Sequence, residues 1–216
     1  MAQTDAKTPR ERYRTQVRAE IKEHAWKQIA TTGASALSLN AIAKQMGMSG
    51  PALYRYYASR DELITELIRD AYRSLADTLR SAPVTGTDLA VLAYAVRGWA
   101  LEDPQRYLLI YGTPVPGYHA PDDITLISSE IMAILLDAGT ASARECPTTP
   151  FDSHLEHHRD WAGSHPAPPA VLHQALSFWT RLHGVLSLEL AGHFTGMGFD
   201  PALLFTAELD DLLARG

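Results

Sequence analysis

A window from Ser38 to Tyr57 constrains the fold more than any other part of this sequence. Gly47 stands near its centre, where a short turn between two steeply crossing helices needs a residue that accepts a positive φ. Ala43 supplies a small side chain where such helices would approach each other. The apolar residues that would form their shared face are Ile42, Met46, Met48, Leu53 and Tyr56. The spacing predicts a helix-turn-helix over residues 39–57.

The outer side of the second short helix carries small residues, a tyrosine and an arginine. Ser49 is a candidate N-cap, and Pro51 is tolerated in a first helical turn. Tyr54 and Arg55 lie beside Leu53 in the sequence and are predicted to point outward. A helix start of this kind suits the major groove of DNA, where arginine can read base edges. Two ordinary short helices would share the apolar spacing without needing such an outer face.

Apolar residues recur every three or four positions along the chain, and no sustained alternation of period two is present. The predicted fold class is therefore all-α, with about nine helices. Pro83 and Gly86 mark a boundary, and residues 145–168, rich in proline and histidine, are predicted to be irregular except for a helical turn near His154. The expected helices cover residues 11–31, 39–46, 50–56, 59–81, 88 onward, 103–112, 122–143, 169–191 and 201–214.

The net charge of −6 conceals a division along the chain. Residues 1–60 hold ten Lys and Arg against four Asp and Glu, a net of +6, so residues 61–216 carry −12. A basic module can meet phosphates, whereas an acidic body does not favour them. We therefore predict an N-terminal arm and helix-turn-helix domain over 1–58, a connecting helix over 59–82 and a helical domain over 83–216.

Residues 39–63, LNAIAKQMGMSGPALYRYYASRDEL, resemble the DNA-binding domain of the tetracycline-repressor (TetR) family. Residues 53–57 match the end of the family's recognition helix, and Arg60 with Leu63 matches the start of the next helix. Trp179, His183 and Gly184 form a Trp-x-x-x-His-Gly pattern that is similar to one type of TetR C-terminal domain. The resemblance implies a transcriptional regulator with an N-terminal three-helix DNA-binding domain and a C-terminal domain that binds a small molecule and dimerises.

Carried over to this sequence, the resemblance assigns DNA contacts to residues around the second short helix. Ser38 is expected to contact a phosphate through its N–H and hydroxyl, Tyr54 and Tyr56 to position the helix on phosphates, and Arg60 to clamp a phosphate. The residues expected to face base edges are Ser49, Gly50, Ala52 and Arg55. The basic residues of an N-terminal arm, which tracks the DNA or forms a solvated tail, are Arg10, Arg12, Arg14 and Arg18.

Two roles are expected of the acidic body. An apolar stripe on the last two helices fits a four-helix interface with a second copy. The candidate interface residues are Leu172, Leu176, Trp179, Leu186, Leu204 and Leu212.

Aromatic side chains, several of which carry a polar group, are candidates for a pocket that binds a hydrophobic or aromatic small molecule. They are Tyr94, Trp99, Tyr107, Tyr111, Trp161, Phe178 and His183. By analogy with the family, Tyr111 would relay ligand binding to the helix over 59–81. Each residue type is also common in an ordinary core.

Other classes of site have weaker support in the sequence. Residues His154, His158 and Asp160 have metal-binding side chains, but a solvated loop explains them better, and no cofactor is expected. The single cysteine, Cys146, cannot form an internal disulfide. Motifs of hydrolases and phosphate-binding enzymes are absent, so no enzymatic activity is expected. Because no apolar run of membrane-spanning length and no signal-like N-terminus is present, a soluble, cytoplasmic protein is expected.

Together these observations predict a homodimer that binds a palindromic operator in double-stranded DNA, represses transcription and is released by a small-molecule ligand. The alternative is a DNA-binding protein of the same fold with an architectural or cell-division role and no inducer. A hydrolase or metal enzyme built on the histidine-rich stretch is the least supported of the three.

Overall fold

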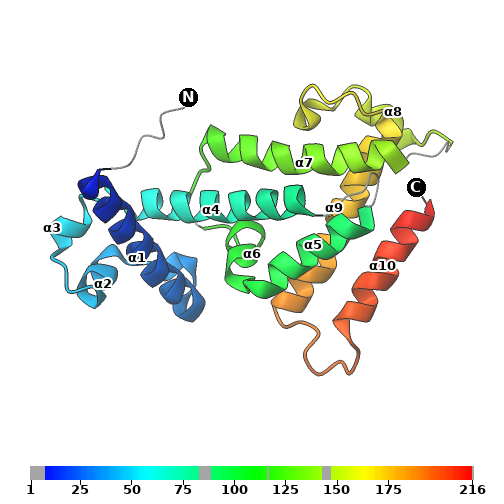
Figure 1. The fold of residues 1–216 in the computed structure, drawn as a ribbon. Coiled ribbons are helices and arrows are strands. Elements are labelled where there is room, and N and C mark those ends of the chain that lie inside the picture. Colours follow the sequence, from blue (N-terminus) through cyan, green and yellow to red (C-terminus); the bar gives the residue numbers. More distant parts are fainter. Residues whose placement is uncertain (1–7, 83–88, 116, 143–146, 216) are drawn as a thin grey trace. The chain divides into compact units, whose positions relative to one another are not determined.

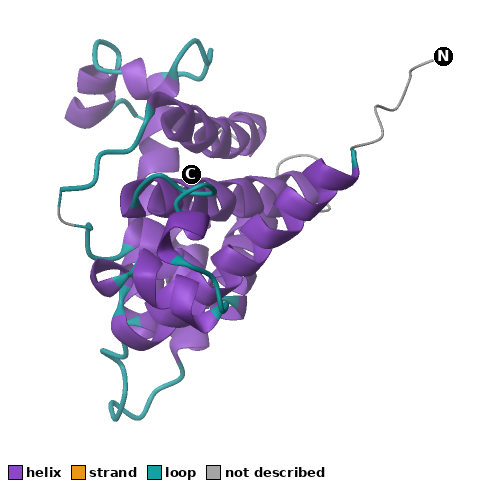
Figure 2. Cartoon of the chain, turned by 90° about the vertical axis from the view of Figure 1, so that its left-hand side faces the viewer, coloured by secondary structure: helices purple, strands orange, loops and turns teal. Residues whose placement is uncertain are grey.

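The computed structural model describes residues 8–82, 89–115, 117–142 and 147–215. Within these ranges all regular secondary structure is helical (Figure 1, Figure 2), which confirms the all-α prediction. The helices are α1 (Pro9–Thr32), η1 (Ala34–Ala36), α2 (Leu39–Gln45), α3 (Gly50–Leu53), α4 (Arg60–Ser81), α5 (Leu89–Glu102), α6 (Pro104–Tyr111), α7 (Asp122–Ser142), α8 (Pro150–Leu155), η2 (Asp160–Ala162), α9 (Pro169–Leu190) and α10 (Pro201–Arg215). Pro83, Gly86, the expected helix start at residue 88 and Cys146 lie outside the described residues.

The start of α1 differs from the sequence expectation. The hydroxyl of Thr8 accepts a hydrogen bond from the Glu11 N–H at 3.3 Å, and the Glu11 carboxylate accepts one from the Thr8 N–H at 2.7 Å. This capping box starts the helix at Pro9, which needs no N–H partner at that position. Arg10, Arg12 and Arg14 are therefore exposed helical residues rather than an extended arm or tail.

The proline- and histidine-rich stretch contains one more helix than expected. Thr149 caps α8 by accepting from the Asp152 N–H at 3.2 Å, and the Asp152 carboxylate accepts from the Thr149 N–H at 2.6 Å. Pro150 occupies the first helical position. The prediction of a mere turn near His154 was therefore too short, because the capping pattern Thr-Pro-x-Asp is itself a helix-start signal.

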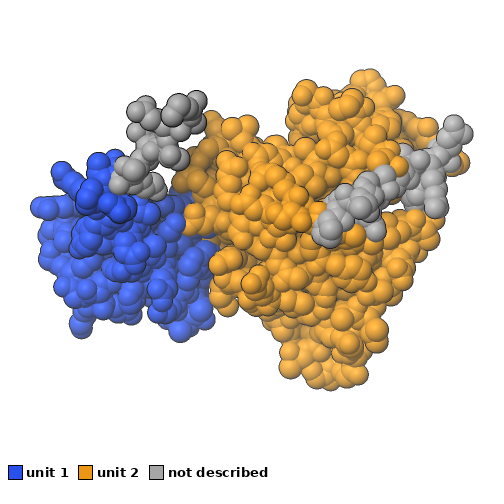
Figure 3. Space-filling model, viewed as in Figure 1, with its two compact units in different colours: residues 1–68, 114–119 blue, residues 69–113, 120–216 orange. Residues whose placement is uncertain are grey.

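The described chain divides into two compact units (Figure 3). The N-terminal unit comprises residues 1–68 and 114–119, and the C-terminal unit comprises residues 69–113 and 120–216. Helix α4 begins in the N-terminal unit and ends in the C-terminal unit, so both units contribute residues to one continuous helix. The module boundaries expected at 58 and 83 stay predictions.

One apolar face of each helix builds the core of the N-terminal unit. The fully or nearly fully buried side chains include Ile21, Ala25, Ile29, Ile42, Leu53, Tyr57, Leu63, Ile64 and Leu67. They come from α1, α2, α3, the turn after α3 and the first part of α4. Because α3 is only four residues long, its position depends on Leu53, which is completely buried.

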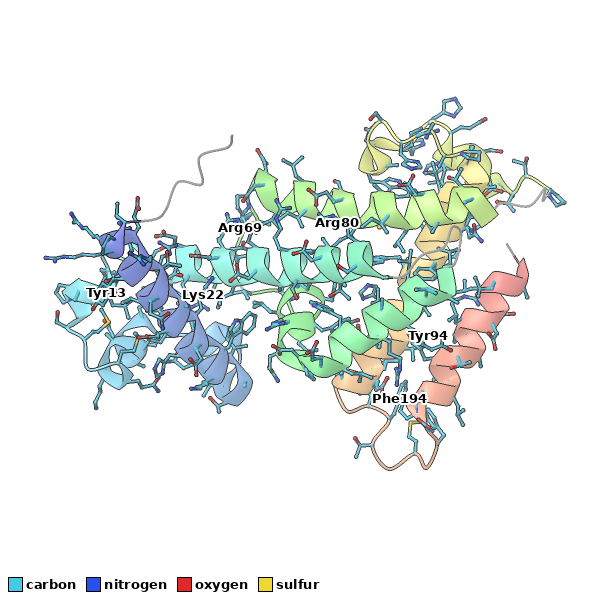
Figure 4. The ribbon with its side chains drawn as sticks, in the orientation of Figure 1. Tyr13, Lys22, Arg69, Arg80, Tyr94 and Phe194 are labelled. Atoms are coloured by element: carbon cyan, nitrogen blue, oxygen red, sulfur yellow. The ribbon has the colours of Figure 1, made fainter. Side chains whose placement is uncertain are left out.

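In the C-terminal unit, α5, α6, α7, α9 and α10 surround one core together with the second part of α4. Its buried side chains include Leu75, Leu92, Trp99, Tyr107, Ile131, Leu135, Phe178, Leu182 and Phe205. Salt bridges of Arg69 with Asp123 at 2.6 Å and of Arg80 with Glu130 link α4 to α7. Figure 4 shows Arg69 and Arg80 between these two helices. A smaller cluster joins α7 and α9 to the α8 region.

Residues Asp122–Ala141 of helix α7, with a mean hydropathy of 1.5, are long and apolar enough to cross a membrane by length and composition alone. The sequence expectation had excluded any such segment. Ile127, Ile131 and Leu135 on this helix are buried in the core of the C-terminal unit. Burial among other helices is the usual situation of an apolar core helix in a packed domain.

Candidate functional site

The turn at Gly47 has the geometry that the sequence predicted. Gly47 has a φ of +65°, and the Met48 N–H donates to the Ala43 carbonyl at 2.8 Å. A positive φ followed by this reach-back bond closes the end of α2. Ile42 and Leu53 are completely buried on either side of the turn. The helix-turn-helix is therefore confirmed.

The second half of the motif departs from the expected helix over 50–56. Helix α3 ends at Leu53, and the following residues form tighter turns, with the Tyr56 N–H donating to the Leu53 carbonyl at 2.8 Å. The Tyr57 N–H also donates to the Leu53 carbonyl, at 3.3 Å. Tyr57, four residues after Leu53, is completely buried, while Tyr56, expected to be packed, is only half-buried.

The outer face of α3 is open to solvent. Tyr54 has 46% of its surface exposed, and Arg55 and Ser49 are also exposed, while Gly50 and Ala52 are half-buried. Ser49 is the N-cap residue of α3, as predicted, but its side chain makes no capping hydrogen bond. Its carbonyl oxygen instead accepts from the Ala52 N–H at 3.0 Å, as the first backbone bond of the helix. The Ser49 hydroxyl is therefore not used to cap the helix.

Ser38 caps α2, but its polar groups are more occupied than expected. The Ser38 N–H donates to the side-chain oxygen of Gln28 at 3.0 Å, and its hydroxyl oxygen accepts from the Ala41 N–H at 3.3 Å. Because the N–H already has this partner, the expected phosphate contact through it stays a prediction with a competing structural role. The hydroxyl proton can still be donated.

Arg60 has a structural role that the sequence did not indicate. One nitrogen of its guanidinium donates to the carbonyls of Ala34 and Ser35, at 2.8 and 3.1 Å. These bonds tie the start of α4 to η1. Because the group is already engaged there, the phosphate clamp assigned to Arg60 stays a prediction with a competing structural role.

Arg18, expected in a DNA-tracking arm, also serves the fold. Its guanidinium pairs with Glu66, donates to the Tyr56 carbonyl at 3.0 Å and lies 4.3 Å from the centre of the Tyr57 ring. Burial by itself would raise the pKa of Glu66, but the hydrogen bond from Arg18 lowers it. Burial raises the pKa of Tyr57. These contacts join α1 to α4 across the motif and exclude Arg18 from an extended arm.

In the C-terminal unit, four of the expected pocket residues meet in one aromatic cluster: Trp99, Tyr107, Tyr111 and His183. The ring centres of Tyr111 and His183 are 4.3 Å apart, and those of Tyr107 and His183 are 5.5 Å apart. Trp179 joins the cluster at 4.1 Å from His183. Tyr72 of α4 meets Tyr111 edge-to-face at 6.0 Å, so Tyr111 does contact α4. We call these six residues the aromatic cluster.

The other expected pocket residues lie elsewhere. Tyr94 is 48% exposed, and its hydroxyl shares a hydrogen bond of 3.1 Å with Thr206 between α5 and α10 (Figure 4). Trp161 packs against the smaller cluster around α8. Phe178 is a buried core residue. The residue types alone could not separate these three from the cluster, because that depends on which helices pack together.

Half of the expected interface residues are unavailable for contact with a second copy. Leu172 and Leu186 are completely buried, and Leu212 is 8% exposed. The apolar stripe that they form faces the interior of the C-terminal unit, so their assignment to a dimer interface is wrong. Trp179 belongs to the aromatic cluster, while Leu176 and Leu204 are half-buried.

An open groove of about 960 Å³ lies along α4 and α5, lined by Asp70, Arg73, Ser74, Asp77, Thr78, Ser81, Ala82, Val91 and Ala95. None of the expected pocket residues lines it. The hydroxyl of Ser74 accepts a hydrogen bond of 3.1 Å from the Trp99 indole, which connects this groove to the aromatic cluster. Among the described residues, no group of three or more His, Cys, Asp or Glu is arranged to hold a metal ion.

Comparison with known families decides what this arrangement belongs to. Residues 21–67 match the model for bacterial regulatory proteins of the tetR family, and residues 89–212 match that for the tetracyclin repressor-like C-terminal domain. The chain belongs to the TetR family. The first matched segment contains the helix-turn-helix, and the second contains the aromatic cluster apart from Tyr72, so this TetR-family chain is a transcriptional regulator with a DNA-binding helix-turn-helix.

Similar proteins support the same assignment. The HTH-type transcriptional regulators Mb1846 of Mycobacterium bovis and Rv1816 of Mycobacterium tuberculosis are each 38% identical to this TetR-family chain, over 99% of it and 98% of the relative. The crystal structure of SCO4313 shares 72% identity with a TM-score of 0.88, covering 96% of this chain and all of that one. A Rhodococcus RHA1 regulatory protein of the tetR family, 17% identical with a TM-score of 0.59, shares the fold.

Proposed function

We propose that this protein represses transcription as a homodimer on a palindromic operator and leaves the DNA when a small molecule binds its C-terminal unit. The observation that carries the DNA-binding part is the exposed face of α3. Tyr54 and Arg55 are exposed directly beside Leu53, which is completely buried and fixes the helix beneath them. Ser49, Gly50 and Ala52 keep the backbone close to this face, as direct readout of base edges requires.

In this proposal Arg55 reads a base and Tyr54 contacts phosphates. Ser38 contributes its hydroxyl to a phosphate, and Tyr56 supports the helix from its half-buried position. Arg10, Arg12 and Arg14 add positive charge along the first turns of α1. Positive charge of this kind raises affinity for any DNA, while the arginine on α3 supplies sequence preference.

The exposed faces of α9 and α10 support dimerisation better than the buried leucines do. Thr180, Gly184 and Leu188 are exposed on α9, and Leu203, on α10, has 71% of its surface exposed. An added Cβ at Gly184 would meet nothing within 4 Å, so no described residue of the same protomer covers this position. Small residues along a helix let a second helix approach closely, and a symmetric dimer places two recognition helices on successive half-sites.

Ligand release is proposed to act through α4. Tyr72 on this helix contacts Tyr111 of the aromatic cluster, and the N-terminal turns of α4 belong to the N-terminal unit. A ligand that displaces Tyr111 would therefore act on a helix that both units share. It lowers DNA affinity only if it binds the DNA-competent state less tightly than the alternative state.

DNA selected from a random pool by the full-length protein tests the operator. The expected product is an inverted repeat. Arg55→Ala should weaken binding to that site about tenfold and relax preference at one base, because one base contact is lost. Recovery of DNA with no common sequence would contradict the repressor and favour an architectural role.

The dimer is tested by light scattering after size-exclusion chromatography. Gly184→Arg should turn the dimer into a monomer, because a long charged side chain would stand on the exposed face of α9. The matched control is Gly98→Arg on α5, another exposed helical glycine whose added Cβ would meet nothing within 4 Å. The control should remain a dimer. A wild-type monomer at working concentration, or a Gly184→Arg dimer, would contradict this interface.

A further inference from the structure

Two polar atoms inside the aromatic cluster have no hydrogen-bond partner among the residues that the structure describes. They are the hydroxyl of Tyr111 and Nε2 of His183, both inaccessible to solvent. The two rings lie 4.3 Å apart, centre to centre. Native proteins pair nearly all buried polar groups, and an unpaired one costs about 1–3 kcal/mol. Two unpaired atoms in neighbouring side chains therefore point to a polar group that is supplied from outside the chain.

The bonds of Tyr107 determine which kind of group fits. Its hydroxyl lies 2.9 Å from His183 Nδ1, 2.8 Å from the Ser187 hydroxyl and 3.2 Å from the His183 carbonyl. A hydroxyl donates one hydrogen bond and accepts two, and a carbonyl only accepts. All three contacts are satisfied together when Tyr107 donates to the carbonyl and accepts from Ser187 and from Nδ1–H.

This network assigns the proton of the imidazole to Nδ1, so that Nε2 carries a lone pair and accepts. Burial lowers the pKa of His183 to about 4, and burial also raises the pKa of Tyr111. Both groups are therefore uncharged near neutral pH. Nε2 requires a donor, while the Tyr111 hydroxyl can donate or accept.

The surrounding side chains restrict the rest of the ligand. Trp179 lies 4.1 Å from His183 and 5.6 Å from Tyr111, ring centre to ring centre, and Tyr72 meets Tyr111 edge-to-face. Trp179 is half-buried and packs against the same core. Aromatic walls favour a flat apolar body and contribute little to binding an ion that keeps its hydration shell.

We propose that the effector is an uncharged molecule with an aromatic or other apolar body and one O–H or N–H donor, which bonds to His183 Nε2 and to the Tyr111 hydroxyl. This inference rests on the proposed ligand release and names the chemistry of that site. Trp179 would have to turn aside for such a molecule to enter. A ligand whose only polar atom is an acceptor would leave Nε2 unpaired.

Three probes of nearly equal shape test the requirement for a donor: 4-methylphenol, 4-methylanisole and toluene. Binding is measured on the full-length protein by the rise in Tm with probe concentration, without DNA. We expect 4-methylphenol to bind about tenfold more tightly than 4-methylanisole, the value of one neutral hydrogen bond. Toluene should resemble 4-methylanisole.

Two variants locate the effect. His183→Leu should remove the preference for 4-methylphenol, because the acceptor is gone, and Tyr111→Phe should reduce it. Tyr94→Phe is the matched control, because it removes a tyrosine hydroxyl from the exposed pair with Thr206 and should preserve the preference. Loss of the preference in His183→Leu but not in Tyr94→Phe supports the proposal even if the fold is slightly destabilised, since each variant is compared with itself across the probes.

Equal binding of the three probes to the wild type would overturn the proposal and indicate an apolar pocket in which water satisfies the polar atoms. Absence of binding by all three would overturn it as well. Because neither measurement involves DNA, both outcomes leave operator binding and dimerisation to their own experiments. Failure of this inference is thereby distinguishable from failure of the proposed repressor function.

Discussion

The two units of this TetR-family regulator hold their candidate sites in opposite ways. In the N-terminal unit, Leu53 is buried and the side chains proposed to act, Tyr54 and Arg55, are exposed. In the C-terminal unit, Tyr107 is completely buried and the polar atoms of Tyr111 and His183 are inaccessible. An exposed basic face suits a long polyanion, whereas an enclosed cluster suits a small molecule.

The arginines of the two units also differ in how exposed they are. Arg55 is exposed, while Arg97 in the C-terminal unit is only 9% exposed, pairs with Glu189 at 2.5 and 2.9 Å and lies over the Phe205 ring. Arg18 and Arg60 in the N-terminal unit are also engaged by the protein. A count of basic residues therefore overstates how many of them are available to DNA.

The largest effect should come from removing the anchor of the exposed face. Leu53→Ala leaves a cavity beneath α3 and should lower the free energy of unfolding of the N-terminal unit by about 2–5 kcal/mol. DNA binding should be lost, while the dimer formed by the C-terminal unit persists. Urea unfolding, light scattering and DNA binding on one preparation measure the three quantities.

The control for this substitution is Leu126→Ala on α7, where the leucine is 66% exposed. It should change the free energy of unfolding by less than about 0.5 kcal/mol, because no packed atom is lost. If Leu53→Ala also turned the dimer into a monomer, the two units would not unfold independently, and the comparison between them would fail.

The enclosed cluster should make the C-terminal unit sensitive to acid. The pKa of His183 is about 4 in the folded protein and near its ordinary value of 6.5 in the unfolded chain. Between these values the unfolded state binds the extra proton, so stability falls as the pH drops from 6.5 to about 4, by up to about 3 kcal/mol, and falls no further from this group below that. Above pH 6.5 the group imposes no penalty.

Replacing the histidine isolates this contribution from all other titrating groups. The stability of His183→Gln should depend less on pH than that of the wild type when urea unfolding is compared at pH about 7.5 and about 4.5. His193→Gln, at an exposed position, serves as control and should follow the wild type. Parallel curves for the wild type and His183→Gln would show that the cluster is open to water.

The fold and the exposed site could be predicted from the sequence because they depend on local rules. Gly47, Ala43 and Leu53 define the turn and its packed side through spacing alone. The helix expected over residues 103–112 is α6, whose start is capped by Asp103 accepting from the Arg106 N–H at 3.3 Å. The unequal distribution of charge along the chain also indicated that the basic module lies in residues 1–60. All of these signals lie within a few residues of one another.

The enclosed site required the structure because its members are far apart in the sequence. Tyr107 and His183 contact each other only because α6 packs against α9. Tyr72 contacts the cluster from α4, and its residue type alone did not predict this contact. Arg60 escaped prediction for the same reason, since its partners are the carbonyls of Ala34 and Ser35. Every residue has a backbone carbonyl, so residue types do not reveal which carbonyl will accept a hydrogen bond.

A moderate effect should separate the two kinds of arginine in the N-terminal unit. Arg60→Ala should lower the free energy of unfolding by about 1 kcal/mol, because the carbonyls of η1 lose charge-assisted bonds. Arg55→Ala should change it by less than about 0.5 kcal/mol, because this side chain is exposed. Chemical unfolding of both variants gives the comparison. Equal loss in the two variants would mean that Arg55 also supports the fold, and the exposed face would then be smaller than proposed.

The smallest effect should come from Tyr111→Phe, in the enclosed cluster. The hydroxyl it removes is buried without a partner, so the free energy of unfolding should stay unchanged or rise by up to about 1 kcal/mol. Tyr107→Phe provides the contrast, because the Tyr107 hydroxyl has three partners and its loss should destabilise the protein. Thermal unfolding without any probe measures both. A loss above about 1 kcal/mol in Tyr111→Phe would mean that an ordered water already satisfies this hydroxyl. The cluster would then be complete without a ligand, and the exposed face of α3 would be the one site in this comparison that still requires an external partner.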